Sequence, residues 1–164
     1  MKPRHARHLA DFDYRGRHRY SVTWCCDGRK PLFQKAEVVN LALGQILRAC
    51  SPSRTRVTVY CFMPDHLHLL VEGTDDGADA KRFFTLAKQF SGYMHSRTYQ
   101  TKLWQRYGWE HVLRDDQRSE DLARYILDNP VRAGLVSTAR AHLFSGSAVF
   151  ARDALMEWAY GQST

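Results

Sequence analysis

Two histidines, His66 and His68, stand on either side of one leucine in the stretch "MPDHLHLLVEG", residues 63–73. On a β-strand, residues two apart point to the same face, with Cα atoms roughly 6.5–7 Å apart. Neutral imidazoles at that spacing can converge on one divalent metal ion. Two ordinary surface histidines would fit the same pattern. A metal site also needs a third ligand from elsewhere in the chain.

The stretch "RYILDNPVRAGLV", residues 124–136, offers a third ligand in Asn129. Tyr125 and Asn129 are four residues apart, so a continuous helix would place them on the same side. The Asn129 amide oxygen could complete the coordination of a hard divalent ion. Uncharged ligands would leave the ion its full charge to activate a phosphodiester. Alternatively, Asn129 is the N-cap of a new helical turn, with Pro130 at its first position and Gly134 at its end.

Tyr125 is a candidate nucleophile for such a phosphodiester. The pKa of a free phenol is about 10, so a tyrosine needs a metal ion or a cation to attack. Arg124 and Arg132 are close enough in sequence to supply that charge. Alternatively, Tyr125 is a core aromatic that packs beside Ile126.

Hydrophobic periodicity predicts the elements that position these residues. Alternating and β-branched segments predict strands over residues 19–26, 56–63, 66–72 and 102–114. Helical spacing predicts helices over residues 35–50, 81–100 and 117–128. A turn at Pro64-Asp65 joins the second and third strands. The order β-α-β-β-α-β is typical of the ferredoxin-like split βαβ fold. The sequence therefore predicts an α+β protein with an antiparallel sheet and an added C-terminal helix that carries Tyr125.

The third predicted strand alternates between two faces. Leu67, Leu69 and Val71 share the face that would pack on the main core. His66, His68, Leu70 and Glu72 share the other face. We therefore expect the two histidines to point away from the main hydrophobic layer.

Length and charge bound the remaining possibilities. The 164 residues predict a single domain over residues 1–164, with a basic N-terminal arm over 1–19 and a C-terminal tail over 137–164 that holds one helix in residues 150–160. The formal net charge of +7 favours a polyanionic partner, nucleic acid before membrane. The sequence shows neither a membrane-spanning stretch nor a secretory signal, so we expect a cytoplasmic protein.

Cations and aromatic residues that could contact DNA occur in two places. The arm is expected to bind DNA phosphates through Lys2, Arg4, Arg7, Arg15, Arg17 and Arg19, although a solvated arm without a ligand is the alternative. In the fourth predicted strand, cations alternate with aromatic side chains that could stack on bases or pack in the core: Trp104, Arg106, Tyr107 and Trp109.

Three stretches together resemble a known family. "YCFMPDHLHLLVEG", "LWQRYGWEHVLRDD" and "ARYILDNPVRAGLV" are similar to the REP-associated tyrosine transposases, relatives of the single-tyrosine HUH transposases. The resemblance runs from residue 20 to residue 136, and the tail after it matches no family motif. It implies a ferredoxin-like nuclease domain that cuts single-stranded DNA near a hairpin. By resemblance, His66 and His68 are the metal-binding pair, Asn129 the third ligand and Tyr125 the nucleophile, with Arg132 near the DNA.

The resemblance also implies cofactors and partners. The metal is magnesium or manganese, the reaction passes through a covalent 5′-phosphotyrosine link, and no organic cofactor is expected. The partner is hairpin-bearing single-stranded DNA, and the protein is a monomer or a weak homodimer. Two alternatives remain open: a ferredoxin-like nucleic-acid-binding module without catalysis, and a hydrolytic metal-dependent nuclease that uses water. The hydrolytic nuclease would want carboxylate ligands near the histidines, where Asp65 is adjacent in sequence.

Overall fold

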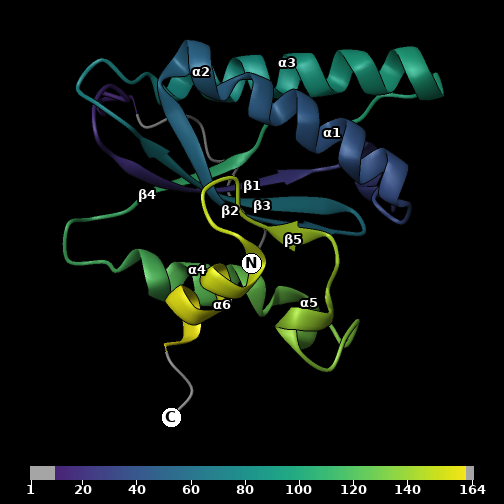
Figure 1. Ribbon diagram of the computed structural model, residues 1–164. Coiled ribbons are helices and arrows are strands. Elements are labelled where there is room, and N and C mark those ends of the chain that lie inside the picture. Colours follow the sequence, from purple (N-terminus) through teal and green to yellow (C-terminus); the bar gives the residue numbers. More distant parts are fainter. Residues whose placement is uncertain (1–9, 162–164) are drawn as a thin grey trace.

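The computed structural model describes residues 10–161 and contains one five-stranded antiparallel sheet (Figure 1). The strand order is β4-β1-β3-β2-β5, which places β3 in the middle of the sheet. The first four strands have the order of the predicted ferredoxin-like fold, and β5 is an addition beside β2. The strands are β1 (Arg19–Cys25), β2 (Thr55–Met63), β3 (His66–Gly73), β4 (Trp109–Val112) and β5 (Ser145–Gly146).

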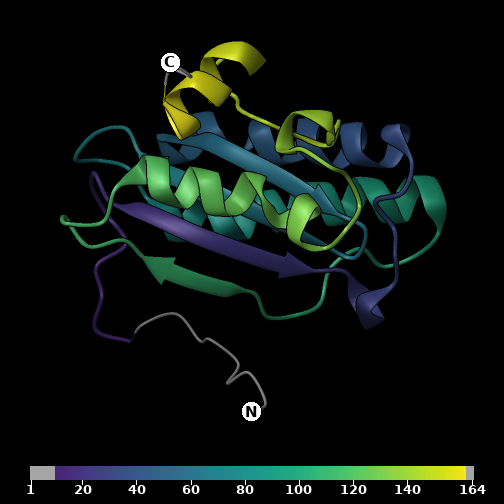
Figure 2. The same ribbon diagram turned by 90° about the horizontal axis from the view of Figure 1, so that it is seen from below.

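Helices cover both faces of this sheet (Figures 1 and 2). On one face lie α1 (Ala36–Arg48), α2 (Cys50–Ser53) and α3 (Ala80–Tyr99). On the other face lie α4 (Ser119–Leu127), α5 (Asn129–Arg132) and α6 (Arg152–Tyr160). Two 3-10 turns, η1 (Asp27–Arg29) and η2 (Ala139–Ala141), complete the elements. Within residues 10–161 we find no helix that combines the length and the apolar character needed to cross a bilayer.

The main core lies between the sheet and the first helical layer. The alternation of β1 and β3 points Trp24, Leu67 and Leu69 into it, and all three are almost completely buried. Ile46 of α1 and Phe83 of α3 pack against them. The predicted core face of β3 is therefore confirmed.

The opposite face of the sheet carries a second core rather than solvent. Leu70 of β3 and Val59 of β2 are fully buried against α4 and α6, which contribute Ile126 and Leu155. The histidines do point away from the main core, as expected. They lie on a face that a second helical layer partly covers.

The fourth strand is shorter than the sequence predicts. Only Trp109–Val112 pair with β1, whereas Trp104 makes a single bridge to Cys26 and is buried in the main core. Gly108 lies so close to the Trp24 indole that a Cβ atom there would collide with it. The prediction of a strand over 102–114 was therefore wrong for residues 102–108, because this part of the chain turns to pack on Trp24.

The C-terminal segment forms part of the second core. β5 pairs with β2 through Tyr60↔Gly146 and Cys61↔Ser145, and α6 lies where the sequence predicts a helix. The residues of this segment in the second core are Ala139, Leu155, Met156 and Ala159. The segment therefore helps to hold α4 on the sheet.

The variant Leu155→Ala tests this contribution to stability. Leu155 is fully buried, so truncation should lower the free energy of unfolding by about 2–5 kcal/mol. Leu143, which is 82% exposed in the same segment, gives the matched control, and Leu143→Ala should change that free energy by less than about 0.5 kcal/mol. Urea unfolding of both variants measures the difference. Equal effects would mean that the C-terminal segment does not pack on the sheet.

Candidate active site

The two histidines of β3 face each other at one end of the sheet. Their Nε2 atoms lie 3.0 Å apart, and the ring planes are at 84° to each other. Both side chains are half-buried on the α4 side of the central strand. The pair is therefore held on the central strand, which pairs with β1 on one side and β2 on the other.

The other nitrogen of each imidazole also has a partner. His66 Nδ1 lies 2.6 Å from Asp65 Oδ1, and His68 Nδ1 lies 3.0 Å from Thr23 Oγ1 on β1. Arg29 holds the second oxygen of Asp65 through its Nε at 2.9 Å. Partners of this kind fix the orientation of metal-binding imidazoles.

The surroundings of the pair favour an uncharged His68. Burial, and then the positive charges of His66, Arg132 and Arg29, lower the pKa of His68 to about 4. At neutral pH His68 therefore carries no charge and keeps a lone pair. Burial alone would raise the pKa of Asp65, but the hydrogen bond from His66 and the charge of Arg29 lower it below its usual value.

The spacing of the two Nε2 atoms fits neighbouring ligands of an octahedral ion. Ligands about 2.1 Å from such an ion, at right angles to each other, lie about 3.0 Å apart. Across residues 10–161, no group of three or more His, Cys, Asp and Glu side chains could hold a metal. A complete site would therefore need the histidine pair together with another kind of ligand.

Tyr125 lies on the exposed side of α4. It is 58% exposed, while its neighbours Ile126 and Leu127 are buried in the second core. The alternative that Tyr125 is a core aromatic is therefore wrong. The Arg132 guanidinium lies over its ring, with Cζ 4.2 Å from the ring centroid. A cation therefore lies over the face of the tyrosine ring.

Asn129 joins Tyr125 and Arg132. Its Nδ2 donates to the carbonyl oxygens of Ile126 at 3.2 Å and Tyr125 at 3.4 Å, so it caps the carboxyl end of α4. Its Oδ1 accepts from Arg132 Nη2 at 2.9 Å, and the same nitrogen donates to the Tyr125 carbonyl at 2.8 Å. One amide side chain therefore fixes both the end of the helix and the position of the guanidinium.

The alternative that Asn129 is an N-cap was wrong by one residue. Asp128 occupies that position without a side-chain bond, and Asn129 begins α5 with Pro130 in its first turn. Gly134 does end this turn, with a φ of 72°. There the amides of Gly134 and Leu135 donate to the carbonyls of Val131 and Pro130, the pattern of a Schellman motif.

Arg132 links the tyrosine group to the histidine group. Its positive charge adds to the effect of burial in lowering the pKa of His68. Burial raises the pKa of Cys61, the register partner of His68 on β2, and the charge of Arg132 opposes that rise. The structure thus brings together His66 and His68 directly, and Tyr125, Asn129 and Arg132 directly. Arg124 does not join them, because it donates to the Ala159 carbonyl and faces α6.

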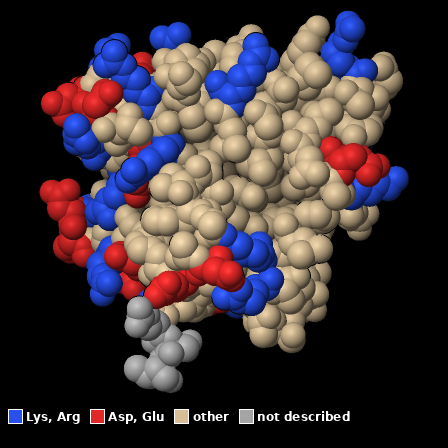
Figure 3. Space-filling model, viewed as in Figure 1, with Lys and Arg blue, Asp and Glu red and all other residues tan. Residues whose placement is uncertain are grey.

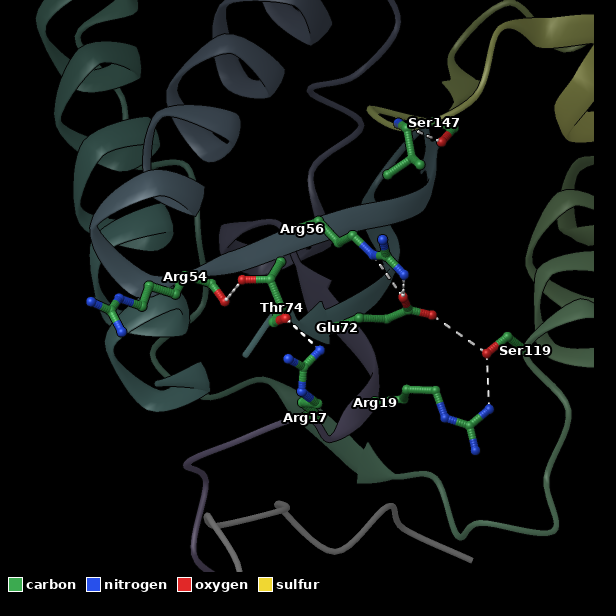
Figure 4. A network of polar contacts seen from close by, with 9 residues as sticks. Arg17, Arg19, Arg54, Arg56, Glu72, Thr74, Ser119 and Ser147 are labelled. Atoms are coloured by element: carbon green, nitrogen blue, oxygen red, sulfur yellow. Dashed lines mark hydrogen bonds and ion pairs between the residues drawn. The ribbon is translucent and has the colours of Figure 1, made fainter. Parts of the chain in front are cut away.

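The described arginines of the arm lie away from this site. Arg15 and Arg17 pair with Asp79 and Asp76, and Arg19 donates to Ser119 and to the Arg114 carbonyl. Arg19 stands opposite Glu72, six residues along β3 from His66 or roughly 20 Å. Figure 4 shows Arg19 beside Ser119, Arg17 beside Thr74, and Arg56 holding Glu72. Lys2, Arg4 and Arg7 lie outside the described residues.

The described part of the basic arm packs on the main core. Tyr14 is only 3% exposed and stacks on Tyr20 in the main core, so the chain is anchored before β1 begins. On the face shown in Figure 3, Lys and Arg side chains alternate with Asp and Glu around the edge, and they form no continuous basic patch there. Any DNA path on this face must therefore use local clusters of cations.

Thr23, Arg29 and the orienting role of Asp65 were not predicted. The contact between Thr23 and His68 depends on the register of β1 against β3. Arg29 reaches Asp65 from η1, where its backbone is left-handed with a φ of 56°. The sequence gives the signal of an acidic residue next to the histidines, but it does not show which way that side chain turns.

Comparison with known proteins identifies the family of the chain. The family model described as IS200-like transposase matches residues 15–128, a span that includes both histidines and Tyr125. A Haemophilus influenzae protein assigned as a REP-associated tyrosine transposase is 30% identical, over 67% of this chain and 67% of its own.

Solved structures share the fold. The structure of a REP-associated tyrosine transposase bound to a REP hairpin matches with a TM-score of 0.70 and 18% identity, over 85% of this chain and 82% of that chain. A crystal structure assigned as a transposase from Deinococcus radiodurans matches with a TM-score of 0.50 and 16% identity, over 76% and 97% of the two chains. The ferredoxin-like fold class is confirmed.

Proposed function

Because the chain belongs to the IS200-like transposase family, we propose that it is a metal-dependent endonuclease and strand transferase for single-stranded DNA. The observation that carries the proposal is the convergence of the His66 and His68 Nε2 atoms at 3.0 Å on the side of the sheet that α4 covers, with Tyr125 exposed on α4. In this proposal the strand supplies a pair of metal ligands and the helix above it a nucleophile for a phosphodiester.

His66 and His68 would hold the divalent ion, magnesium or manganese, because their Nε2 atoms converge while their Nδ1 atoms are held by Asp65 and Thr23. When bound, the ion supplies Lewis-acid activation of a phosphate oxygen. Asn129 is the proposed third ligand. Its Oδ1 has two lone pairs, and the hydrogen bond from Arg132 occupies one of them.

Tyr125 would attack the scissile phosphorus. Its phenolic oxygen gives up its proton and bonds to phosphorus as the bond to the 3′-oxygen breaks, and that oxygen takes up a proton and leaves as a 3′-hydroxyl. The 5′-phosphate stays on the tyrosine, so a later 3′-hydroxyl can reverse the step and join strands. Arg132, over the Tyr125 ring, is placed to attract the phosphate to the nucleophile.

The contacts of Asp65 favour a tyrosine nucleophile over water. A hydrolytic nuclease would use carboxylate ligands, but both Asp65 oxygens already have partners, His66 Nδ1 and Arg29. Asp65 therefore orients His66. A binding module without catalysis would not need the half-buried chain of hydrogen bonds Thr23–His68–His66–Asp65.

The proposed partner is hairpin DNA with unpaired flanks. The structural relative is bound to a REP hairpin, and the net charge of +7 favours a polyanion. The arm cations Arg15, Arg17 and Arg19 lie at the far end of β3, so we propose that they, with Lys2, Arg4 and Arg7, contact DNA away from the cut. A monomer or a weak homodimer in the cytoplasm is the proposed state.

The test is a denaturing gel with end-labelled single-stranded DNA that carries REP-type hairpins, in manganese or in chelator. We expect a labelled band at the size of the protein in manganese, and its loss in chelator. Cleavage without the band would instead indicate a water-using nuclease. Binding without cleavage across the hairpin set would indicate the non-catalytic module.

A further inference from the structure

Trp109 is an exposed aromatic residue on the same face of the sheet as the histidine pair. In the antiparallel register, Trp109 of β4 stands opposite Thr23 of β1, and Thr23 stands opposite His68 of β3. Residues paired in this way point to the same face. Trp109 and His68 are two strand spacings apart, or roughly 10 Å between Cα atoms.

The fold exposes this tryptophan while it buries the neighbouring one. Trp109 is 49% exposed, whereas Trp104, five residues earlier, is 5% exposed and packs in the main core. Gly108 fits against the Trp24 indole and so brings β4 in at a fixed position. The next residue, Glu110, pairs with Val22 of β1, which is buried in the main core on the α3 side, so Glu110 faces that side. Trp109 must therefore face the opposite way, toward the histidines.

The chain that leads into β4 carries a cation and a second exposed aromatic ring. Lys88 Nζ donates to the Gln105 and Arg106 carbonyls at 2.8 and 3.4 Å and so holds the chain that leads into β4. Arg106 lies over the Tyr107 ring at 5.3 Å, and Tyr107 is itself 52% exposed. Exposed aromatic rings among cations are what proteins use to bind single-stranded nucleic acid without reading its sequence.

We propose that Trp109 stacks on an unpaired base of the DNA strand that carries the scissile phosphate, one or a few nucleotides from the cut. This inference rests on the proposed function, since the same strand must reach Tyr125. Stacking at this distance fixes the backbone between the base and the histidine pair. Trp109 is therefore a positioning residue, and the ligand class is a nucleobase of any identity.

The test measures DNA affinity in chelator, where no cleavage occurs, by fluorescence anisotropy of labelled hairpin DNA with unpaired flanks. An abasic site is moved through the flanking positions one at a time. Trp109→Ala should weaken binding about tenfold, the range for loss of one stacked base, and Trp109→Phe should restore it to within about threefold. One abasic position should weaken the wild-type protein by a similar factor and leave Trp109→Ala unchanged.

Tyr93→Ala gives the matched control. Tyr93 is 60% exposed on α3, the helix that covers the other face of the sheet, and its loss should leave both affinity and the abasic profile unchanged. Thermal unfolding shows whether Trp109→Ala and Trp109→Phe fold alike. The stacking proposal is overturned if every abasic position weakens the wild-type protein and Trp109→Ala by the same factor. If the wild-type protein also cleaves DNA in that case, the proposed function still stands. If the wild-type protein neither binds nor cleaves, the proposed function itself fails.

Discussion

Tyr125→Phe is expected to abolish both the covalent protein–DNA band and strand cleavage. The substitution removes only the phenolic oxygen, so the ring can still lie beneath Arg132 and the affinity for hairpin DNA should change by less than about threefold. Loss of a covalent nucleophile costs several orders of magnitude in rate, roughly 10⁴-fold or more. Single-turnover cleavage of end-labelled DNA on a denaturing gel measures the rate, and anisotropy measures the affinity.

Tyr93→Phe is the control for the loss of a phenol. Tyr93 is also an exposed helical tyrosine accompanied by an arginine, with Arg97 Cζ 6.0 Å from its ring centroid. This variant should cleave at the wild-type rate. A covalent band that persists in Tyr125→Phe would assign the nucleophile to another residue and reject this part of the proposal.

His68→Ala should remove metal binding and cleavage together. His68 supplies one of two converging nitrogens, and alanine leaves His66 alone to face the ion. Even loss of a residue that merely orients a ligand lowers metal affinity 10–100-fold, so loss of the ligand should lower it by at least about 100-fold. Titration with manganese, followed by calorimetry or by the loss of the free-ion EPR signal, measures the affinity.

His111→Ala is the control, because it removes an imidazole that lies outside the histidine pair. His111 is exposed on β4, and its register partner Ser21 lies opposite Leu70 instead of a histidine. The variant should keep manganese affinity and cleavage. If His68→Ala bound manganese and cut DNA like the wild-type protein, the histidine pair would be a structural hydrogen-bonded pair and the ion would lie elsewhere.

The order of the elements could be predicted from the sequence because periodicity reports local structure. The alternation of "RYSVTWCC" and the β-branched run of "RVTVYCFM" correspond to β1 and β2. The fourth strand was predicted too long, since Trp104 and Gly108 sit in strand-like sequence but pack on Trp24 and Cys26. Packing between distant segments sets where β4 begins, and a local sequence pattern carries no information about such packing.

The second helical layer was harder to predict. Leu70 shares a face with the histidines, so its burial depends on α4 and α6, which are distant in the sequence. β5 has only two residues, Ser145 and Gly146, and such a short strand has no periodicity. The contacts of the C-terminal segment therefore needed the structure.

The sequence allowed us to predict which residues belong to the site, but not most of the contacts between them. Tyr125 and Arg132 do lie together. Sequence spacing made Arg124 an equal candidate for the cation beside Tyr125, but Arg124 instead donates to α6. The Asn129 amide donates to a carbonyl at the end of α4, and this bond is possible because α4 ends at Leu127. The sequence predicts an end at residue 128, one residue later.

The short outer strands limit how this protein can associate with a second copy. On one side, the chain from Phe144 to Ala148 covers the β2 edge from Val57 to Phe62 by backbone hydrogen bonds. On the other side, β4 offers four residues, of which Trp109 and His111 are exposed and Glu110 is charged. Such an edge is a poor template for joining two sheets into one. A homodimer of the described chain is therefore not expected to form by pairing of sheet edges.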